Sequence, residues 1–434
     1  MNLLVSYFNK FKKQIKNLCV YFLAALIPMV LSFISNPFIA KNMSPEDYAI
    51  VGYYTAFNSL FGPLVNFYLL HYYTKRFYEL TEEKRRELKA TLFRALIFFS
   101  FVVYLISLGF LFGYKEFFNS DSKIPFLPYA VMALLPLPIS GLYSLALVEY
   151  RMQRNSESFF KLSVSHGVAG VVASVLFVVV LKWGAVGRLS ASLIDYTIFF
   201  IILFVLNRDL WKVKFNREVF VDAIKFCWPL VLASMLTFFS NGYDKVLLER
   251  SGDVALLGIY SVGVSIANYL HVFSTSINDT FQPDIFENIV KRNYKRCAQF
   301  IVIKLSIMAT CVVVFIICAP FLVKVLTFGK YVASTKYAII VSLSTIVSMM
   351  YYSMSQVTVA LGFTSITLAN KILGSVLSIL SYGILISRFG AVGAAWGMVL
   401  SYFYFFLGNT IMVVIKYKAK KKNENRNINI SSPN

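Results

Sequence analysis

Lysine and asparagine residues interrupt several long apolar stretches of this chain. Lys245, Lys304 and Lys371 each lie within or beside such a stretch. A lysine ammonium acts as a point charge for a phosphate group, and an asparagine amide donates to and accepts from hydroxyl groups. These residue types suit an anionic, sugar-bearing substrate, although any transporter of polar solutes shows similar residues.

Polar groups are costly inside a membrane and usually face a cavity or one another, so each is a functional candidate. Those within or near apolar stretches are Asn58, Asn66, His71, Asp195, Asn241, Asp244, Lys245, Asn268, His271, Asp279, Lys304, Asn370 and Lys371. From these we select seven candidate substrate-binding residues: Asn66, His71, Asp244, Lys245, Asn268, Lys304 and Lys371.

Structural explanations compete with a binding role for several of these candidates. The stems of Lys304 and Lys371 are long enough to reach the inner membrane interface. Asp244 is next to Lys245, but adjacent residues on a helix point to different faces. A bridge from Asp244 to another helix is therefore the structural alternative, and an interfacial position is the alternative for His71.

No enzyme motif or metal-ligand pattern occurs in the sequence. The chain contains no Gly-x-Ser-x-Gly elbow, no His-Glu-x-x-His pair and no Gly-x-x-x-x-Gly-Lys phosphate loop. Its five cysteines and three histidines do not have zinc-ligand or redox spacing. We therefore expect no catalytic residue, no metal and no cofactor, and we expect that the protein is not an enzyme.

The composition indicates an all-α polytopic membrane protein. Of the 434 residues, 58% are apolar and only 15% are charged, whereas soluble domains contain about 25% charged residues. The charges are concentrated between apolar runs of about 20 residues, the length that crosses a bilayer core. A β-barrel would instead show alternating segments of about 10 residues.

Hydropathy predicts twelve transmembrane helices, and the basic residues predict their orientation. The expected spans are 18–40, 48–73, 91–113, 124–148, 161–182, 185–206, 226–248, 254–280, 298–321, 332–360, 364–386 and 391–415. With the N-terminus inside, about three quarters of the Lys and Arg residues fall on the inner side. Both termini are then cytoplasmic. The net charge of +21 belongs to a rim facing anionic lipid, so we expect no nucleic-acid partner.

An internal repeat divides the chain into two halves. The segment Asp-Tyr-Ala-Ile-Val-Gly-Tyr-Tyr at 47–54 resembles Asp-Val-Ala-Leu-Leu-Gly-Ile-Tyr, which starts 206 positions later at Asp253. Gly-Ala-Val-Gly at 184–187 recurs at 390–393 with the same offset. Two separated matches at one offset indicate duplication of a six-helix unit, which predicts two parallel-repeat lobes.

The repeat and the charge pattern together define the expected domains. Residues 1–210 form a six-helix N-terminal lobe, 211–225 a cytoplasmic linker, and 226–415 a six-helix C-terminal lobe. Residues 416–434 are basic and then rich in Asn and Ser, so we expect a disordered cytoplasmic tail.

Several motifs resemble the polysaccharide-biosynthesis (O-antigen, Wzx-type) flippases of the multidrug/oligosaccharidyl-lipid/polysaccharide exporter superfamily. The similarity covers nearly the whole chain. The motifs that carry it are Asn-Pro-Phe-Ile-Ala at 36–40, the stretch at 44–54, Trp-Pro-Leu at 228–230, Asn-Gly-Tyr-Asp-Lys at 241–245, Gly-Ile-Tyr at 258–260, Phe-Gln-Pro-Asp at 281–284 and the two Gly-Ala-Val-Gly segments.

This resemblance implies a V-shaped pair of lobes around a central cavity that opens alternately to either side of the membrane. It also implies a cargo of oligosaccharide on undecaprenyl diphosphate, moved from the cytoplasmic to the periplasmic leaflet of the bacterial inner membrane. The implied partners are this lipid-linked substrate, membrane lipids, polysaccharide polymerase and chain-length proteins.

The chain departs from relatives of this superfamily in two respects. Helix one, at about 18–40, lacks the Asp or Glu that drug exporters often use for ion coupling, and no Arg lies deep in a helix. Lys245, Lys304 and Lys371 would therefore have to meet the diphosphate. A multidrug or small-solute antiporter is the alternative function. A membrane-embedded glycosyl polymerase is a third, and it is disfavoured by the short outer loops.

Overall fold

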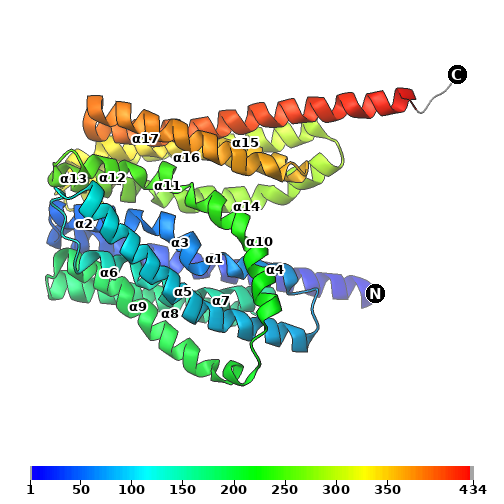
Figure 1. Cartoon of the computed structure of the whole chain (residues 1–434), viewed down its shortest axis with the longest axis horizontal. Coiled ribbons are helices and arrows are strands. Elements are labelled where there is room, and N and C mark those ends of the chain that lie inside the picture. The colour runs from blue at the N-terminus through cyan, green and yellow to red at the C-terminus, as the bar shows by residue number, and fades with distance from the viewer. Residues whose placement is uncertain (1, 431–434) are drawn as a thin grey trace. The chain divides into compact units, whose positions relative to one another are not determined.

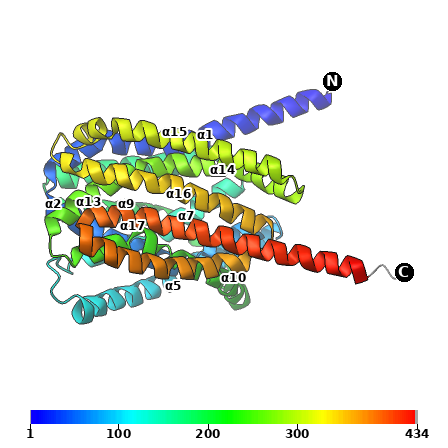
Figure 2. The same ribbon diagram turned by 90° about the horizontal axis from the view of Figure 1, so that it is seen from above.

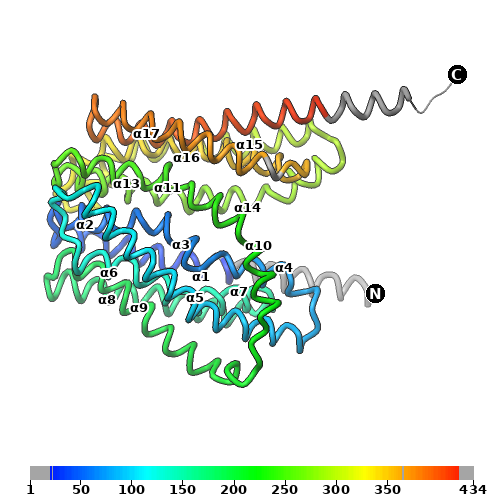
Figure 3. Tube along the Cα trace, in the orientation of Figure 1, coloured from blue at the N-terminus to red at the C-terminus, as the bar shows by residue number. Residues whose placement is uncertain are grey.

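The computed structural model describes residues 2–430 and the side chains of 20–21, 23–363 and 366–419. Residue 1 and residues 431–434 lie outside the described residues (Figure 3), and 431–434 are the end of the predicted tail. The described chain is all-helical, without strands, as the composition predicts. Its contacts divide it into two compact units. Unit 1 contains residues 1–235 and 324–330, and unit 2 contains residues 236–323 and 331–434.

Unit 1 contains the first ten α-helices of the chain and two shorter turns of helix (Figure 1). They are α1 (Asn2–Asn42), α2 (Pro45–Ala56), α3 (Asn58–Asn66), α4 (Leu69–Arg76), α5 (Glu82–Phe118), α6 (Tyr129–Leu134), α7 (Pro136–Met152), α8 (Ser156–Ser174), η1 (Val175–Val180), α9 (Gly184–Leu206), η2 (Arg208–Lys212) and α10 (Arg217–Met235).

Unit 2 contains the helices that follow, and α16 and α17 run side by side in both ribbon views (Figures 1 and 2). They are α11 (Phe238–Asn241), α12 (Tyr243–Glu249), α13 (Val254–Ala267), α14 (Tyr269–Val290), α15 (Tyr294–Leu326), η3 (Val332–Ser334), α16 (Thr335–Ala360) and α17 (Thr364–Ile430). The last turn of α15 belongs by its contacts to unit 1. α17 is two antiparallel helices that meet at Gly390, where φ is +56°.

Ten helices among the described residues are long and apolar enough to cross a membrane. The last, Ile366–Ala419, contains both arms of α17, and α2–α4 occupy the remaining expected span in three short pieces. The prediction of an all-α, twelve-span membrane protein is thus confirmed. Many large apolar side chains stay exposed on these helices, including Phe98, Ile106 and Phe110, as expected of surfaces that face lipid.

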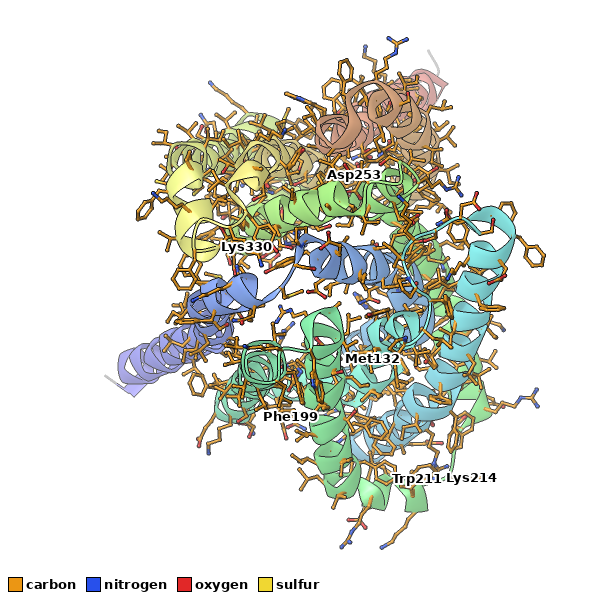
Figure 4. All side chains as sticks on the ribbon, turned by 90° about the vertical axis from the view of Figure 1, so that its left-hand side faces the viewer. Met132, Phe199, Trp211, Lys214, Asp253 and Lys330 are labelled. Atoms are coloured by element: carbon orange, nitrogen blue, oxygen red, sulfur yellow. The ribbon has the colours of Figure 1, made fainter. Side chains whose placement is uncertain are left out.

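The segment around Trp211 shows how unit 1 holds its inter-helix turn. The guanidinium of Arg94, on α5, donates to the carbonyl oxygens of Leu210, Trp211 and Val213. These carbonyls lie at the end of η2, where carbonyl groups lack helical partners and a cation is well suited to satisfy them; the Leu210 oxygen also accepts from the Val213 amide at 3.3 Å. Figure 4 shows Trp211 and Lys214 at this turn between α9 and α10. Within the predicted linker at 211–225, η2 ends at Lys212 and α10 begins at Arg217, so part of this linker is helical.

The helix α10 packs into the core of unit 1. Ala223, Cys227 and Val231 are fully buried there in a cluster with Tyr73 and Leu92. By contacts the chain therefore divides after Met235, whereas the sequence predicts a second lobe from residue 226. The helix α17 is described up to Ile430, and the disorder of the predicted C-terminal tail stays a prediction. The functional lobe boundaries stay a prediction.

Candidate functional site

A cavity of about 370 Å³ lies within unit 2. The helices α11 to α14, α16 and the second arm of α17 surround it. It is lined by Asn241, Lys245, Val264, Ala267, Asn268, His271, Val272, Val341, Ser344, Thr345, Ser348, Met398 and Tyr402. Its volume is within the range of small-ligand sites, and its wall combines apolar side chains with several polar groups, as such sites commonly do.

The cavity lies beside a discontinuous helix. The sequence predicts one continuous span over 226–248, but the structure breaks it after Met235 and again at Gly242, where φ is −151°. Side chains from the first arm of α17 satisfy carbonyl groups near these breaks. Ser375 donates to the Leu236 oxygen at 3.2 Å, and Tyr382 donates to the Ser240 oxygen at 3.1 Å. Discontinuous helices commonly form transporter binding sites.

Lys245 carries an uncompensated positive charge at this cavity. Its side chain is only 9% exposed, and its ammonium makes no hydrogen bond or ion pair with the side chains that the structure describes. The adjacent Asp244 is fully buried and instead accepts a 2.6 Å hydrogen bond from the Tyr260 hydroxyl. Since neighbouring residues on a helix point apart, the carboxylate does not neutralise the lysine.

The other polar groups of the cavity are uncharged amides and hydroxyls, together with the imidazole of His271. Tyr402 donates a 2.9 Å hydrogen bond to the Asn241 side-chain oxygen. Ser344 and Ser348 donate to carbonyls of their own helix, α16. No Asp or Glu is among the described residues that line the cavity. The arrangement can therefore bind an anion at Lys245 and hydroxyl groups along the remaining wall.

Lys304 and Lys371 are also buried in unit 2, but neither lines this cavity. The Lys304 ammonium, fully buried, donates to Asn278 Oδ1 at 2.6 Å and to Gln356 Oε1 at 3.3 Å. The Lys371 ammonium donates to Thr237 Oγ1 at 3.2 Å. It also lies 4.5 Å from the ring centroid of Phe405. The ammonium group of each lysine therefore already has neutral partners within unit 2.

Asn66 and His71 belong to unit 1, on either side of a break between α3 and α4. Phe67 and Tyr68 both have left-handed backbones there, with φ of +45° and +52°. Asn66 Oδ1 is buried without a hydrogen-bond partner, whereas His71 is exposed and packs against the Tyr68 ring at 4.6 Å. Of the seven candidates, the structure brings only Lys245 and Asn268 together at the unit 2 cavity, and their binding role stays a prediction.

Several cavity residues were not selected from the sequence. Asn241 and His271 are recognisable as polar groups in apolar stretches. Ser344, Thr345 and Ser348 give no such signal, because serine and threonine are common in membrane helices and bond to their own backbone. Only the packing of α16 against α13 and α14 shows that these hydroxyls face the same space as Lys245.

The comparison with protein families identifies the chain. Residues 15–289 match the family described as "Polysaccharide biosynthesis protein". The chain belongs to this family. The resemblance found in the sequence motifs is thereby confirmed at the level of the family. A search of curated protein sequences finds no match.

Several solved transporter structures share the fold of this chain. An inward-facing multidrug resistance MATE family transporter of the MOP superfamily matches with a TM-score of 0.71 and 14% identity, over 92% of this chain and 99% of the other. The lipid II flippase MurJ, in an inward closed conformation, matches with a TM-score of 0.68 and 14% identity, over 91% and 87%. A MOP superfamily transporter from Pyrococcus furiosus matches with a TM-score of 0.58 and 13% identity, over 94% and 96%. At these identities the likeness establishes the fold.

Proposed function

We propose that this protein is a flippase for lipid-linked oligosaccharides. It moves undecaprenyl-diphosphate-linked repeat units of a surface polysaccharide, such as O-antigen or capsule, from the cytoplasmic to the periplasmic leaflet by alternating access. Membership of the polysaccharide biosynthesis family supports the cargo class. The same fold in a protein described as a lipid II flippase supports transport of a lipid-linked sugar.

The observation that carries this proposal is the unpaired Lys245 ammonium in an otherwise uncharged polar cavity. A diphosphate supplies the negative charge that Lys245 lacks. Asn241, Asn268 and the α16 hydroxyls are suited to bonding sugar hydroxyls. A charge-assisted hydrogen bond of this kind contributes about 1.5–3 kcal/mol, or roughly 10- to 100-fold in affinity.

A multidrug or small-solute antiporter is the second candidate, because MATE transporters share the fold. Two features disfavour it. Lys245 would repel the cationic compounds that many drug exporters carry. The described part of helix one, residues 20–42, contains no Asp or Glu. A membrane-embedded glycosyl polymerase is disfavoured because the turn between α5 and α6 is short, leaving no room for a catalytic outer loop.

The proposal places the protein in the bacterial inner membrane with both termini in the cytoplasm, following the distribution of Lys and Arg. Its partners are then the lipid-linked substrate and membrane lipids, with the polysaccharide polymerase and chain-length proteins acting on the flipped product. The protein itself performs no covalent step.

Deletion and complementation test this function. Without the gene, lipid-linked repeat units accumulate on the cytoplasmic side and surface polysaccharide disappears. Wild-type protein restores both. We expect Lys245→Ala to restore flipping about 10- to 100-fold less well at equal protein level, since the diphosphate contact is lost. The readouts are surface polysaccharide and the leaflet distribution of the lipid-linked intermediate.

The matched control is Lys295→Ala, which removes an exposed lysine at the start of α15 in the same unit. It should complement like wild type, and Lys245→Arg should retain most of the activity. Normal surface polysaccharide in the deletion strain, with altered drug resistance, would contradict the flippase and favour the antiporter. Full activity of Lys245→Ala would contradict the assigned site.

A further inference from the structure

Unit 1 contains a buried histidine–carboxylate pair that the proposed cargo site does not use. His166 Nε2, on α8, lies 3.2 Å from Asp195 Oδ2, on α9. The side chains are 16% and 6% exposed. The sequence marks Asp195 as a polar group in an apolar stretch, but it does not pair Asp195 with His166.

Both halves of the pair have unused hydrogen-bonding capacity. The two side chains are within ion-pair distance but are not oriented as a hydrogen bond, so His166 Nε2 has no hydrogen-bond partner. Asp195 Oδ1 is also buried without one. Buried structural ion pairs normally have their remaining atoms satisfied. A buried pair left unsatisfied in a membrane helix is therefore a functional candidate.

Aromatic rings enclose the pair and limit its contact with water. The Tyr143 ring stacks on the His166 ring with centroids 4.1 Å apart. Tyr196 and Phe199 lie 4.6 Å and 5.3 Å from it, and Phe199 is labelled in Figure 4. Charge–charge attraction is stronger in such a water-poor site than in solution, so the gain or loss of one proton changes the energy of the pair strongly.

The Asp195 carboxylate lies against Gly170 of the facing helix. A Cβ added to Gly170 would lie 2.9 Å from Asp195 Oδ2. The absence of a side chain at this position of α8 therefore leaves space for the carboxylate to approach His166, which lies one helical turn earlier. This close approach offers a way to disturb the pair without changing its ionisable groups.

Other ionisable groups on the surrounding elements do not neutralise the pair. Tyr143 from α7 and Tyr196 from α9 face it. Several charged groups elsewhere on the packed elements have partners of their own or are exposed: Arg188 donates to Ser174, Glu149 pairs with Lys89, Asp47 accepts from the Ala185 amide, and Glu46 and Lys41 are exposed. The Tyr21 ring packs on Phe159, and its hydroxyl is buried without a hydrogen-bond partner.

We propose that His166 and Asp195 form a proton-binding site that couples transport to the proton gradient. This inference rests on the proposed flippase function. One proton entering the pair converts imidazole and carboxylate into an imidazolium–carboxylate pair, and its release to water on the other side of the membrane restores the starting state. A metal ion is disfavoured as the occupant, because the described residues contain no group of three or more His, Cys, Asp or Glu that could hold one.

Proton binding can be measured directly on the purified full-length protein. The chain has only three histidines, so ring-labelled histidine gives three sets of NMR signals, and His166→Gln identifies one of them. We expect Asp195→Asn to move the His166 titration midpoint by about one pH unit or more, since a neighbouring charge is removed. The signals of His71 and His271 should not move. An unchanged His166 titration would overturn the proposal.

A second variant replaces Asp195→Asn if that protein folds poorly, and a third is a control. Gly170→Ala should also move the His166 titration, because its new methyl group contacts Asp195. Asp209→Asn is the matched control. It removes an exposed carboxylate that pairs with Lys212 just beyond α9, and it should leave all three histidine titrations unchanged.

Flipping assays in cells then separate this proposal from the flippase function itself. Dissipating the proton gradient with a protonophore should slow wild-type flipping about tenfold. Asp195→Asn and His166→Gln should flip slowly with or without the gradient. Wild-type flipping that ignores the protonophore would overturn proton coupling while leaving the flippase intact. Absence of flipping in the wild type would instead refute the flippase, whatever the histidine titration shows.

Discussion

The two halves of the duplication share their backbone turns but differ in their buried charges. Gly184 in unit 1 and Gly390 in unit 2 both open a Gly-Ala-Val-Gly segment, and their φ angles are +55° and +56°. Gly187 and Gly393, three residues later, both approach carbonyl oxygens of the preceding helix too closely for a Cβ. The repeated sequence thus specifies the same helix reversal in both units.

The charged residues of the two candidate sites do not follow the repeat, although Asp47 and Asp253 do. Lys245 of unit 2 corresponds to Ile39 in unit 1, a buried member of an apolar cluster. In the other direction, His166 and Asp195 correspond to Ile372 and Ser401. The comparison shows that a common frame carries different chemistry in its two copies: a cationic cavity in unit 2 and a histidine–carboxylate pair in unit 1.

Exchanging the residues at the corresponding positions 39 and 245 should have the largest effect on stability. We expect Ile39→Lys to destabilise the protein by about 3–5 kcal/mol, because it places an unpaired charge among Met43 and Val178. The reciprocal Lys245→Ile should fold normally and lose cargo binding. Thermal unfolding of the two purified variants measures their stability, and a cargo-binding assay measures the loss of binding in Lys245→Ile. Equal tolerance of the two exchanges would show that the cavity gives Lys245 no special environment.

The paired tyrosines at 54 and 260 should show a smaller difference. Tyr260→Phe removes the hydrogen bond that Asp244 accepts, at a cost of about 1.5–3 kcal/mol because a buried carboxyl oxygen loses its donor. Tyr54 instead donates to the neutral Pro125 carbonyl at 2.7 Å, so Tyr54→Phe should cost about 0.5–1.5 kcal/mol. Thermal unfolding in detergent tests the order. A larger loss for Tyr54→Phe would contradict this ranking of the two hydrogen bonds.

The matched glycines should give losses of a size similar to those of the tyrosine variants. Alanine in a sparsely populated region of φ and ψ costs about 1–3 kcal/mol, which is the loss expected for Gly390→Ala at φ +56° and ψ −133°, where a Cβ would meet nothing within 4 Å. Gly184→Ala should cost more, because its Cβ would lie 2.5 Å from Asp47 Oδ1 and disturb the cap of α2. Gly383→Ala, in open space on α17, is the control and should be neutral. Equal losses at 184 and 390 would argue against this contact.

The sequence predicts the helices well because their information is local. Apolar runs locate the membrane spans, and the duplicated glycines locate the reversals before α9 and within α17. The breaks in α10–α12 were not predictable in the same way, since the groups that satisfy them, Ser375 and Tyr382, come from a distant helix.

The candidate site was predictable only in part. Lys245 is conspicuous in the sequence because a charge interrupts an apolar stretch. The partners of Lys304, which are Asn278 and Gln356, lie on two other helices, so hydropathy alone could not separate this satisfied lysine from the unpaired one. The sequence gives no signal at His166 for the same reason, because its contact with Asp195 depends on the register between α8 and α9.

The central claim is that Lys245 binds the diphosphate of the cargo, and a binding measurement tests it most directly. Isothermal titration of the purified protein with a short-chain prenyl diphosphate would compare wild type, Lys245→Ala and Lys295→Ala. We predict a 10- to 100-fold weaker affinity for Lys245→Ala alone, and a wild-type affinity that falls with added salt. Equal affinities for all three proteins would contradict the account.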